Sequence, residues 1–201
     1  MTRLLTALLA TLLAIGTSGC VTRVAAPVQY DFGPVYLDAV KPPVPRLPAL
    51  NLAEVQSAPW LDGPLIFYRL GYANIQQAAP YAGSRWSMTP AQLIGQRLKT
   101  RIAQEGGTVL SQSGGASQLP LLRLELDDFI QIFATPASSV GQLSLRASVF
   151  HGPQLVAQKQ FARQVNAPTA DAAGGARALA TASDGVITDM LDWLASLPLK
   201  K

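Results

Sequence analysis

Cysteine and histidine are almost absent from this chain of 201 residues. It has one cysteine, Cys20, and one histidine, His151. A lone cysteine cannot close an internal disulfide. One cysteine and one histidine together cannot form a Cys/His zinc cluster or a two-histidine metal site. Charged residues are also scarce, at 14% of the chain, with 16 Lys and Arg against 12 Asp and Glu. We therefore expect no metal and no cofactor, and the lack of a Lys/Arg cluster disfavours nucleic-acid binding.

An apolar run long enough to span a bilayer is missing from the N-terminal segment. Residues 4–15 form an apolar stretch of 12 residues after Arg3, whereas a transmembrane helix needs roughly 20. A cationic start, a short apolar run and small residues are the order of a secretory signal peptide. Ser18 and Gly19 then precede Cys20, which resembles the lipobox of bacterial lipoproteins, where cleavage occurs just before a lipidated cysteine.

We expect residues 1–19 to be a lipoprotein signal peptide and Cys20 to carry acyl chains such as palmitate. The motif departs from its usual form at Thr17, where leucine is preferred. The alternative, a signal peptide cleaved elsewhere, would leave an unpaired thiol in an oxidising compartment. Several acyl chains anchor stably because each buried methylene contributes about 0.8 kcal/mol. Val21 stands where aspartate favours the inner membrane of enteric bacteria, so we expect the periplasmic face of the outer membrane.

A proline-rich tether follows the cysteine. Proline fixes the backbone and removes an amide donor, which favours extended chain. We interpret residues 20–48 as this tether and residues 49–201 as the folded domain. Within the tether, the segment Tyr30–Pro34 sets two aromatic residues beside a Gly-Pro turn, which predicts that it docks on the domain. The prolines of the tether are Pro27, Pro34, Pro42, Pro43, Pro45 and Pro48.

Hydrophobic periodicity predicts seven strands and two helices in the domain. Thr89-Pro90-Ala91-Gln92 is a capping-box pattern that begins the first helix, and Gly106-Gly107 ends it. An alanine-rich helix begins at Asp171, with an apolar stripe that includes Leu179 and Met190. The predicted strands are 49–57, 65–70, 74–77, 108–111, 119–133, 143–149 and 155–163, and the predicted helices are 90–105 and 171–197.

The long strand 119–133 has the clearest alternation in the chain. Leu122, Leu124 and Leu126 share one face, with charged residues between them. Continuing that alternation places Ile130 and Ile132 with the leucines, and Phe129 and Phe133 on the polar face. The helices are too few to cross over between every pair of strands. We therefore expect an α+β fold, with a mostly antiparallel sheet packed against two main helices.

Catalytic groups are few. His151 stands in a tight turn, and no nucleophile-elbow motif is present for a Ser-His-Asp hydrolase. Asp127 and Asp128 are neighbours on a strand, so we expect them on opposite faces and not as an acid/base pair; a structural role, at a bulge for example, fits them better. The Gly-Gly pairs lack the spacing of a nucleotide-binding loop. The sequence thus predicts no catalytic residue and no enzyme.

Aromatic and arginine residues recur in the turns between residues 59 and 86. Arginine stacks on aromatic rings, and both residue types are enriched at interfaces. Packing within the domain and contact with a partner are both open interpretations of them. The residues that we expect at a partner surface are Trp60, Arg69, Tyr81, Arg85 and Trp86.

Several short patterns, in order along the chain, resemble the ABC-type transport auxiliary lipoprotein family. These are the outer-membrane lipoprotein components of MCE-type, paraquat-inducible-like lipid transport systems. The resemblance covers nearly the whole mature chain. The residues that carry it are Tyr30–Pro34, Pro59–Pro64, Tyr68-Arg69, Tyr81, Arg85-Trp86, Pro90 to Gly107, Leu126–Phe129, Asp171–Gly175 and Trp193-Leu194.

The resemblance implies a non-enzymatic accessory that helps to move lipids between the inner and outer membranes. Its implied partners are an MCE-domain periplasmic protein, an ABC permease and an ATPase. Phospholipid binding and a homo-oligomer remain open. An envelope-assembly or structural lipoprotein is the alternative function, and a lipoprotein hydrolase is a weaker one because the chain offers little catalytic apparatus.

Overall fold

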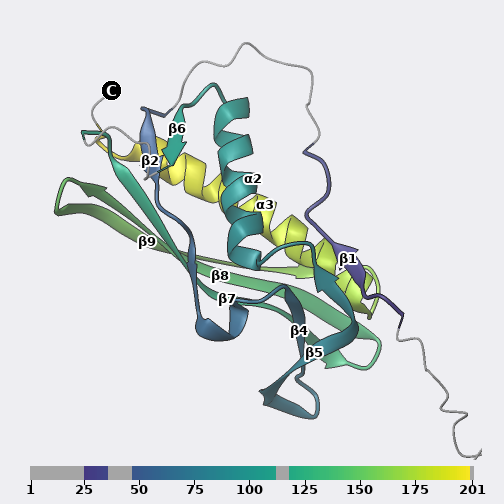
Figure 1. Cartoon of the computed structure of the whole chain (residues 1–201). Helices are drawn as coiled ribbons and strands as arrows, with labels where there is room; N and C mark the ends of the chain where they lie inside the picture. Colours follow the sequence, from purple (N-terminus) through teal and green to yellow (C-terminus); the bar gives the residue numbers. More distant parts are fainter. Residues whose placement is uncertain (1–24, 36–46, 112–117, 200–201) are drawn as a thin grey trace, which may run out of the picture.

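The computed structural model describes residues 25–35, 47–111 and 118–199. Within them, one nine-stranded curled sheet carries two helices on one face (Figure 1). Cys20 and the signal peptide lie outside the described residues. In chain order the elements are β1 (Val28–Tyr30), β2 (Leu50–Leu52), β3 (Gln56–Ser57), the 3-10 turn η2 (Pro59–Leu61), β4 (Leu65–Leu70), β5 (Asn74–Trp86), α2 (Pro90–Gln104), β6 (Val109–Ser111), β7 (Leu121–Thr135), β8 (Ser138–His151), β9 (Gln154–Asn166) and α3 (Ala172–Ser196).

Strand β7 is the centre of the sheet. One edge of β7 pairs antiparallel with β8 along its length, and β8 pairs in the same way with β9. The other edge is shared by β2, β3 and β4, which all run parallel to β7. β5 returns antiparallel to β4, and β1 adds parallel to β5. The α+β prediction with two main helices is confirmed, but the sheet is mixed because its short strands pair in parallel.

The capping box that begins α2 is confirmed. The Gln92 amide N–H donates to the Thr89 hydroxyl oxygen, and the Gln92 side-chain oxygen accepts from the Thr89 amide. Ile94, Leu98 and Ile102 are all buried on the face toward the sheet. Gly106 follows the helix with φ of +73°, a left-handed conformation that glycine adopts readily. Sequence and structure agree here because every signal is local.

Helix α3 packs unusually close to the sheet at its N-terminal half. A Cβ atom added to Gly175 would overlap the Gln131 side chain of β7, and one added to Gly141 of β8 would overlap the α3 backbone at Ala178 and Leu179. These glycines, together with small alanines, let the helix backbone approach the strands. From the sequence Gly175 only weakens the first turn of α3; the structure shows that it is needed for packing.

A β-bulge in β7 overturns the predicted register of its second half. The pairing with β8 shifts between Leu126 and Asp128, so Leu126 pairs with Leu145 and Phe129 pairs with Leu143. The bulge inserts one residue. After it, the odd-numbered side chains lie on the helix-covered face that the even-numbered leucines occupy before it. Phe129 and Phe133 are therefore buried with the leucines, and the prediction that they lie on the polar face was wrong.

Strand β5 is much longer than the predicted piece 74–77. It continues to Trp86, through Pro80 and Gly83, which interrupt a strand pattern in sequence. Proline is tolerated where its missing amide donor faces no partner. The extension matters because the last three residues of β5 form the pairing surface for β1.

The segment Val28–Pro34, which we call the strap, is built into the folded body. β1 pairs with residues 84–86, and the Ser87 amide N–H donates to the Tyr30 carbonyl oxygen at 2.7 Å. The Phe32 ring is buried and packs against Trp86 and Phe129, with ring centroids 5.9 and 6.0 Å away. The prediction that this part of the tether docks on the domain is confirmed.

Candidate functional site

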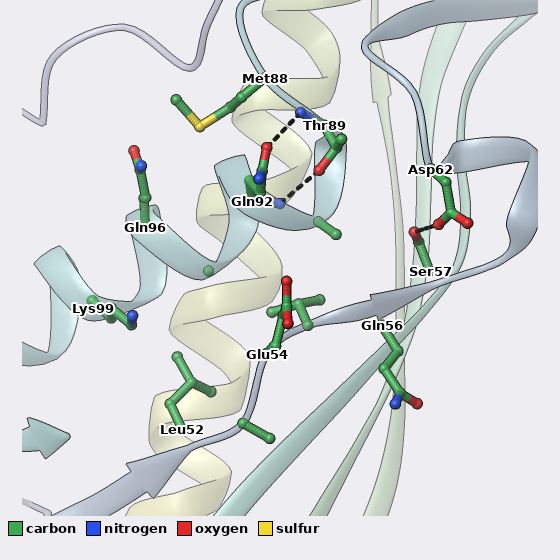
Figure 2. Close-up of a pocket in the computed structure, with 14 residues that line it drawn as sticks. Leu52, Glu54, Gln56, Ser57, Asp62, Met88, Thr89, Gln92, Gln96 and Lys99 are labelled. Carbon is green, nitrogen blue, oxygen red and sulfur yellow. Dashed lines mark hydrogen bonds between the residues drawn. The ribbon is translucent and has the colours of Figure 1, made fainter. Parts of the chain in front are cut away.

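An open groove lies between α2 and the chain from β2 to β3 (Figure 2). Its volume is about 830 Å³, and it is open to solvent. Glu54 and Lys99 are its charged residues apart from Asp62, which accepts a hydrogen bond from the Ser57 hydroxyl at 2.7 Å. The other side chains are mostly amides, small residues and Met88.

Among the described residues, this groove shows no hydroxyl nucleophile hydrogen-bonded to a basic side chain. The only hydroxyl–carboxylate contact in it, Ser57 to Asp62, has no histidine or lysine within its hydrogen bonds, and nucleophilic catalysis needs such a base. The Thr89 hydroxyl is used in capping α2. Across the described residues no cluster of three or more His, Cys, Asp or Glu side chains could hold a metal ion. The groove offers shape and hydrogen-bonding groups, with Glu54, Asp62 and Lys99 as its charged side chains.

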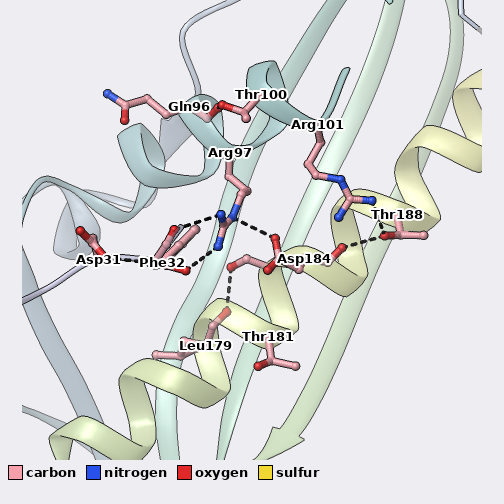
Figure 3. A network of polar contacts seen from close by, with 12 residues as sticks. Asp31, Phe32, Gln96, Arg97, Thr100, Arg101, Leu179, Thr181, Asp184 and Thr188 are labelled. Atoms are coloured by element: carbon pink, nitrogen blue, oxygen red, sulfur yellow. Dashed lines mark hydrogen bonds and ion pairs between the residues drawn. The ribbon is translucent and has the colours of Figure 1, made fainter. Parts of the chain in front are cut away.

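A second polar centre holds the strap in place (Figure 3). Arg97 of α2 is buried, and its Nη1 donates to the Gly33 carbonyl oxygen at 3.1 Å while Nη2 donates to the Phe32 carbonyl oxygen. Its Nε forms an ion pair with Asp184 of α3 at 2.9 Å. One guanidinium thus joins the strap and both helices, which suits its planar set of five donors.

The electrostatics of this centre follow from burial. Arg97 is 6% exposed and Asp184 is 39% exposed at the side chain. Burial raises the pKa of the Asp184 carboxyl, and the nearby charges of Arg97 and Arg101 oppose that rise. An ion pair of this kind is costly to break from one side, because the remaining charge stays desolvated. The cluster is a structural clamp on the strap.

A third polar centre lies under α3, beside the bulge in β7. The Tyr81 hydroxyl donates to Gln131 Oε1 at 2.9 Å, and Gln131 Nε2 donates to the Ser139 hydroxyl at 2.7 Å. Gln131 is fully buried, so both of its hydrogen bonds are required to offset desolvation. Burial raises the pKa of the Tyr81 hydroxyl, with Tyr68 and Asp171 adding to the rise. No sequence pattern pointed to Gln131, since a single glutamine in an apolar strand carries no spacing signal.

The five residues predicted at a partner surface lie in different settings. Trp86 is 1% exposed and belongs to the core, because β1 and Phe32 cover it. Trp60 packs edge-on against Phe67, and Tyr81 packs on Tyr68.

Arg69 is bound within its own hairpin, and Arg85 is the exposed member of the five. Arg69 Nη1 donates to the carbonyl oxygens of Ile75 and Gln76 at 3.1 and 3.0 Å. Arg85 lies near the end of β5 with its side chain in solvent. The five residues therefore do not form one exposed surface, and partner contact by any of them stays a prediction.

Asp127 and Asp128 lie at the bulge, as a structural role would require. The prediction that they point to opposite faces was wrong, because the bulge lets both reach the face without helices: Asp127 lies 3.6 Å from Arg146, and Asp128 accepts from Gln142 at 2.6 Å. Burial raises the pKa of Asp128, and the Gln142 hydrogen bond opposes the rise. Both carboxyls are held by side chains of β8, in a polar network that includes Glu125.

His151 is exposed at the end of β8, next to the turn at Gly152. This agrees with a surface turn histidine. Neither of the helices described here has the length and hydropathy of a membrane-crossing segment.

A curled mixed sheet with two helices on one face, an open polar groove and a clamped N-terminal strap define an α+β module. A family model for the ABC-type transport auxiliary lipoprotein component matches residues 30–190. The chain therefore belongs to the ABC-type transport auxiliary lipoprotein family. The match begins within the strap and ends within α3, so it covers every element of the body except the start of β1 and the end of α3.

Solved structures share this fold. A protein from Xanthomonas campestris superimposes with a TM-score of 0.64 at 18% identity, over 85% of this chain and 92% of that one. An uncharacterized protein gives a TM-score of 0.64 at 14% identity, over 85% of this chain and 99% of that one. At such identities the likeness concerns the fold alone. No curated protein matches the sequence.

Proposed function

We propose that this protein is a non-enzymatic accessory of an MCE-type ABC system that transports lipids between the inner and outer membranes. The observation that carries the proposal is the family match over residues 30–190, whose description is a lipoprotein component of ABC-type transport. The lipobox-like residues before Cys20 supply the anchor that such a component needs. The partners are then an MCE-domain periplasmic protein, a permease and an ATPase.

The location that fits this role is the periplasmic face of the outer membrane, with Cys20 as the lipidated residue. An accessory fixed there can hold the outer end of a conduit whose permease and ATPase belong to the inner membrane. The strap supports this arrangement because Arg97 ties it to both helices, so that force on the anchor reaches the folded body. The open groove beside α2 offers polar contact area and no reactive group.

Detergent extraction and affinity purification of the tagged full-length protein from its own host test the proposal. We expect an MCE-domain protein to co-purify, together with the permease and the ATPase. The matched control fuses residues 1–27 to an unrelated soluble domain, which keeps the signal and the cysteine but lacks the body. Recovery of envelope-assembly proteins instead of transporter subunits would favour the structural alternative.

Acylation is tested separately with a fatty-acid probe. Wild type should be labelled and Cys20→Ser should not, because Cys20 is the sole cysteine. Equal labelling of the two proteins would contradict the predicted anchor.

A further inference from the structure

The strap places a short distance between the lipidated cysteine and the folded body. Ala25, the first described residue, follows Cys20 by five residues, which span at most about 18 Å when fully extended. β1 begins three residues later and is fixed to β5. From Cys20 to Val28 the chain has eight residues and can span at most about 29 Å, whereas the 15 residues of β7 extend for about 50 Å. The connection between anchor and body is therefore shorter than the long axis of the sheet.

Such a short connection allows one end of the sheet to lie near the bilayer. Figure 1 shows β1 and the start of α3 at one end of the long strands, and the β8–β9 turn at the other. We call these the strap end and the far end. With Cys20 held in a membrane, the strap end is the nearer one.

The outer edge of the strap end carries apolar side chains beside an arginine. Val28 is 55% exposed and Leu65 is 42% exposed. Gln29 and Leu65 both pair with Arg85, one on each side of it, so these three side chains share one face of the sheet. Val28, one residue earlier in β1, projects from the opposite face at the same end of the sheet. Exposed aliphatic side chains next to an arginine suit a bilayer interface, because the aliphatic groups enter the headgroup region while the guanidinium reaches a phosphate.

Charges of both signs lie around this edge. Arg177, exposed on the first turns of α3, lines a groove with Gln29 on the other side of the strap. Asp31 accepts from the Gly33 amide at 2.7 Å, and Asp171 accepts from the Gly174 amide at 2.7 Å. These amide hydrogen bonds leave both carboxylates charged, so the arginines supply local contacts to lipid phosphates and no net positive field.

We propose that the edge formed by Val28, Leu65 and Arg85 rests on the phospholipid bilayer that holds Cys20. The body then stands on its strap end, with the β8–β9 turn directed away from the membrane toward a partner. This inference rests on the anchor in the proposed function, and it adds an orientation that the anchor alone does not fix. The short chain from Cys20 to Val28 keeps this edge within reach of the bilayer that holds the anchor, which is the reason for proposing a bilayer as its occupant.

Site-specific labelling of the lipidated full-length protein tests this orientation. Because acylation consumes Cys20, an introduced cysteine is the only free thiol. Leu65→Cys carries a fluorescent label at the strap end, and Leu155→Cys, a leucine of similar exposure in β9 (48%), is the matched control. Both proteins are reconstituted into vesicles of phosphatidylethanolamine with a minor share of phosphatidylglycerol, with and without lipids that carry a nitroxide at the headgroup.

We expect nitroxide lipids to quench the label at position 65 at least about threefold more strongly than the label at position 155, since headgroup contact is short-ranged. Equal quenching at the two positions, or none at position 65, would overturn the orientation. Vesicle flotation of the wild type reports the anchor independently, and a wild type that fails to float would overturn both anchor and orientation. Transporter co-purification in detergent needs no bilayer, so its loss concerns the proposed function alone.

Arg85→Glu separates a lipid contact from a protein contact at the same edge. The proposal expects weaker quenching of the label at position 65 and unchanged co-purification with the transporter in detergent. Lost co-purification with unchanged quenching would make this edge a partner surface and would refute the bilayer contact.

Discussion

At the strap end of the sheet Phe32 packs between Trp86 and Phe129, whereas at the far end Leu155 is half exposed in an edge strand. A contrast between buried and exposed contacts also holds for the arginines that pair with α3. Arg97 is buried and joins three segments, while Arg163 contacts Asp189 at 2.8 Å with both side chains about half exposed. Phe32 and Arg97 thus give the strap buried contacts of the kind that the exposed positions of β9 lack.

Truncation of the strap's aromatic residue should give the largest difference between the two ends. We expect Phe32→Ala to lower the free energy of unfolding by about 3–5 kcal/mol, because it leaves a cavity beside Trp86 and Phe129. Leu155→Ala, at the exposed far end, should change it by less than about 0.5 kcal/mol. Urea unfolding of both variants measures this, and similar losses would erase the contrast.

The two arginines provide a charge-matched version of that comparison. Arg97→Ala should cost about 3 kcal/mol, the low end for breaking a buried ion pair, because Asp184 keeps some contact with water. Arg163→Ala should cost at most about 1 kcal/mol, since exposed pairs contribute little. Thermal melting and urea titration of the two variants measure both losses of stability. A larger effect for Arg163 would place the critical clamp between β9 and α3 and not at the strap.

Close packing of α3 at the strap end predicts a smaller but specific effect. Gly175→Ala should destabilise by about 1–3 kcal/mol, because its new methyl group would overlap the buried Gln131 amide and displace it from its hydrogen bonds to Tyr81 and Ser139. Gly83→Ala has open space around it and should stay within about 0.5 kcal/mol. Equal stability of the two variants in urea would mean that α3 sits farther from β7.

The cap of α3 should show the smallest effect, and a dependence on pH. Asp171 accepts hydrogen bonds from the Gly174 amide and the Thr169 hydroxyl, which lower the pKa of its carboxyl. Asp171→Ala should therefore cost about 1 kcal/mol at neutral pH. A lowered pKa stabilises the fold above the unfolded value and loses that contribution as pH falls, so the difference should shrink below about pH 4. A constant difference down to pH 2 would contradict this cap.

Local sequence signals predicted α2 almost to the residue, because a capping box, an apolar stripe and a glycine stop all act within one helix. The strand β4 and the long β7–β8–β9 meander were also predictable from alternation. The sequence could not predict which residues change faces after the bulge at Asp127 and Asp128. One inserted residue reverses the faces of every residue after it, and its place depends on the partner strand.

The candidate site was harder to predict than the fold. Trp86 and Arg85 are neighbours with similar sequence signals, yet one is core and the other is exposed, since burial depends on whether the strap adds to β5. Arg97 gave no signal at all, because a lone arginine in an amphipathic helix has no spacing that marks its partners. Gln131 was missed for the same reason. Docking of the strap was predictable, from two aromatics beside a Gly-Pro turn.

Hydrogen exchange of the mature, vesicle-bound protein tests the clamped strap most directly. The account predicts that the amides of residues 28–34 are protected to nearly the same degree as those of residues 84–87, to which β1 is bonded. It also predicts that Arg97→Ala accelerates exchange in the strap more than in β8 and β9, whose exchange rises only with the loss of global stability. Exchange of residues 28–34 at the rate of an unstructured peptide in the wild type would contradict the account.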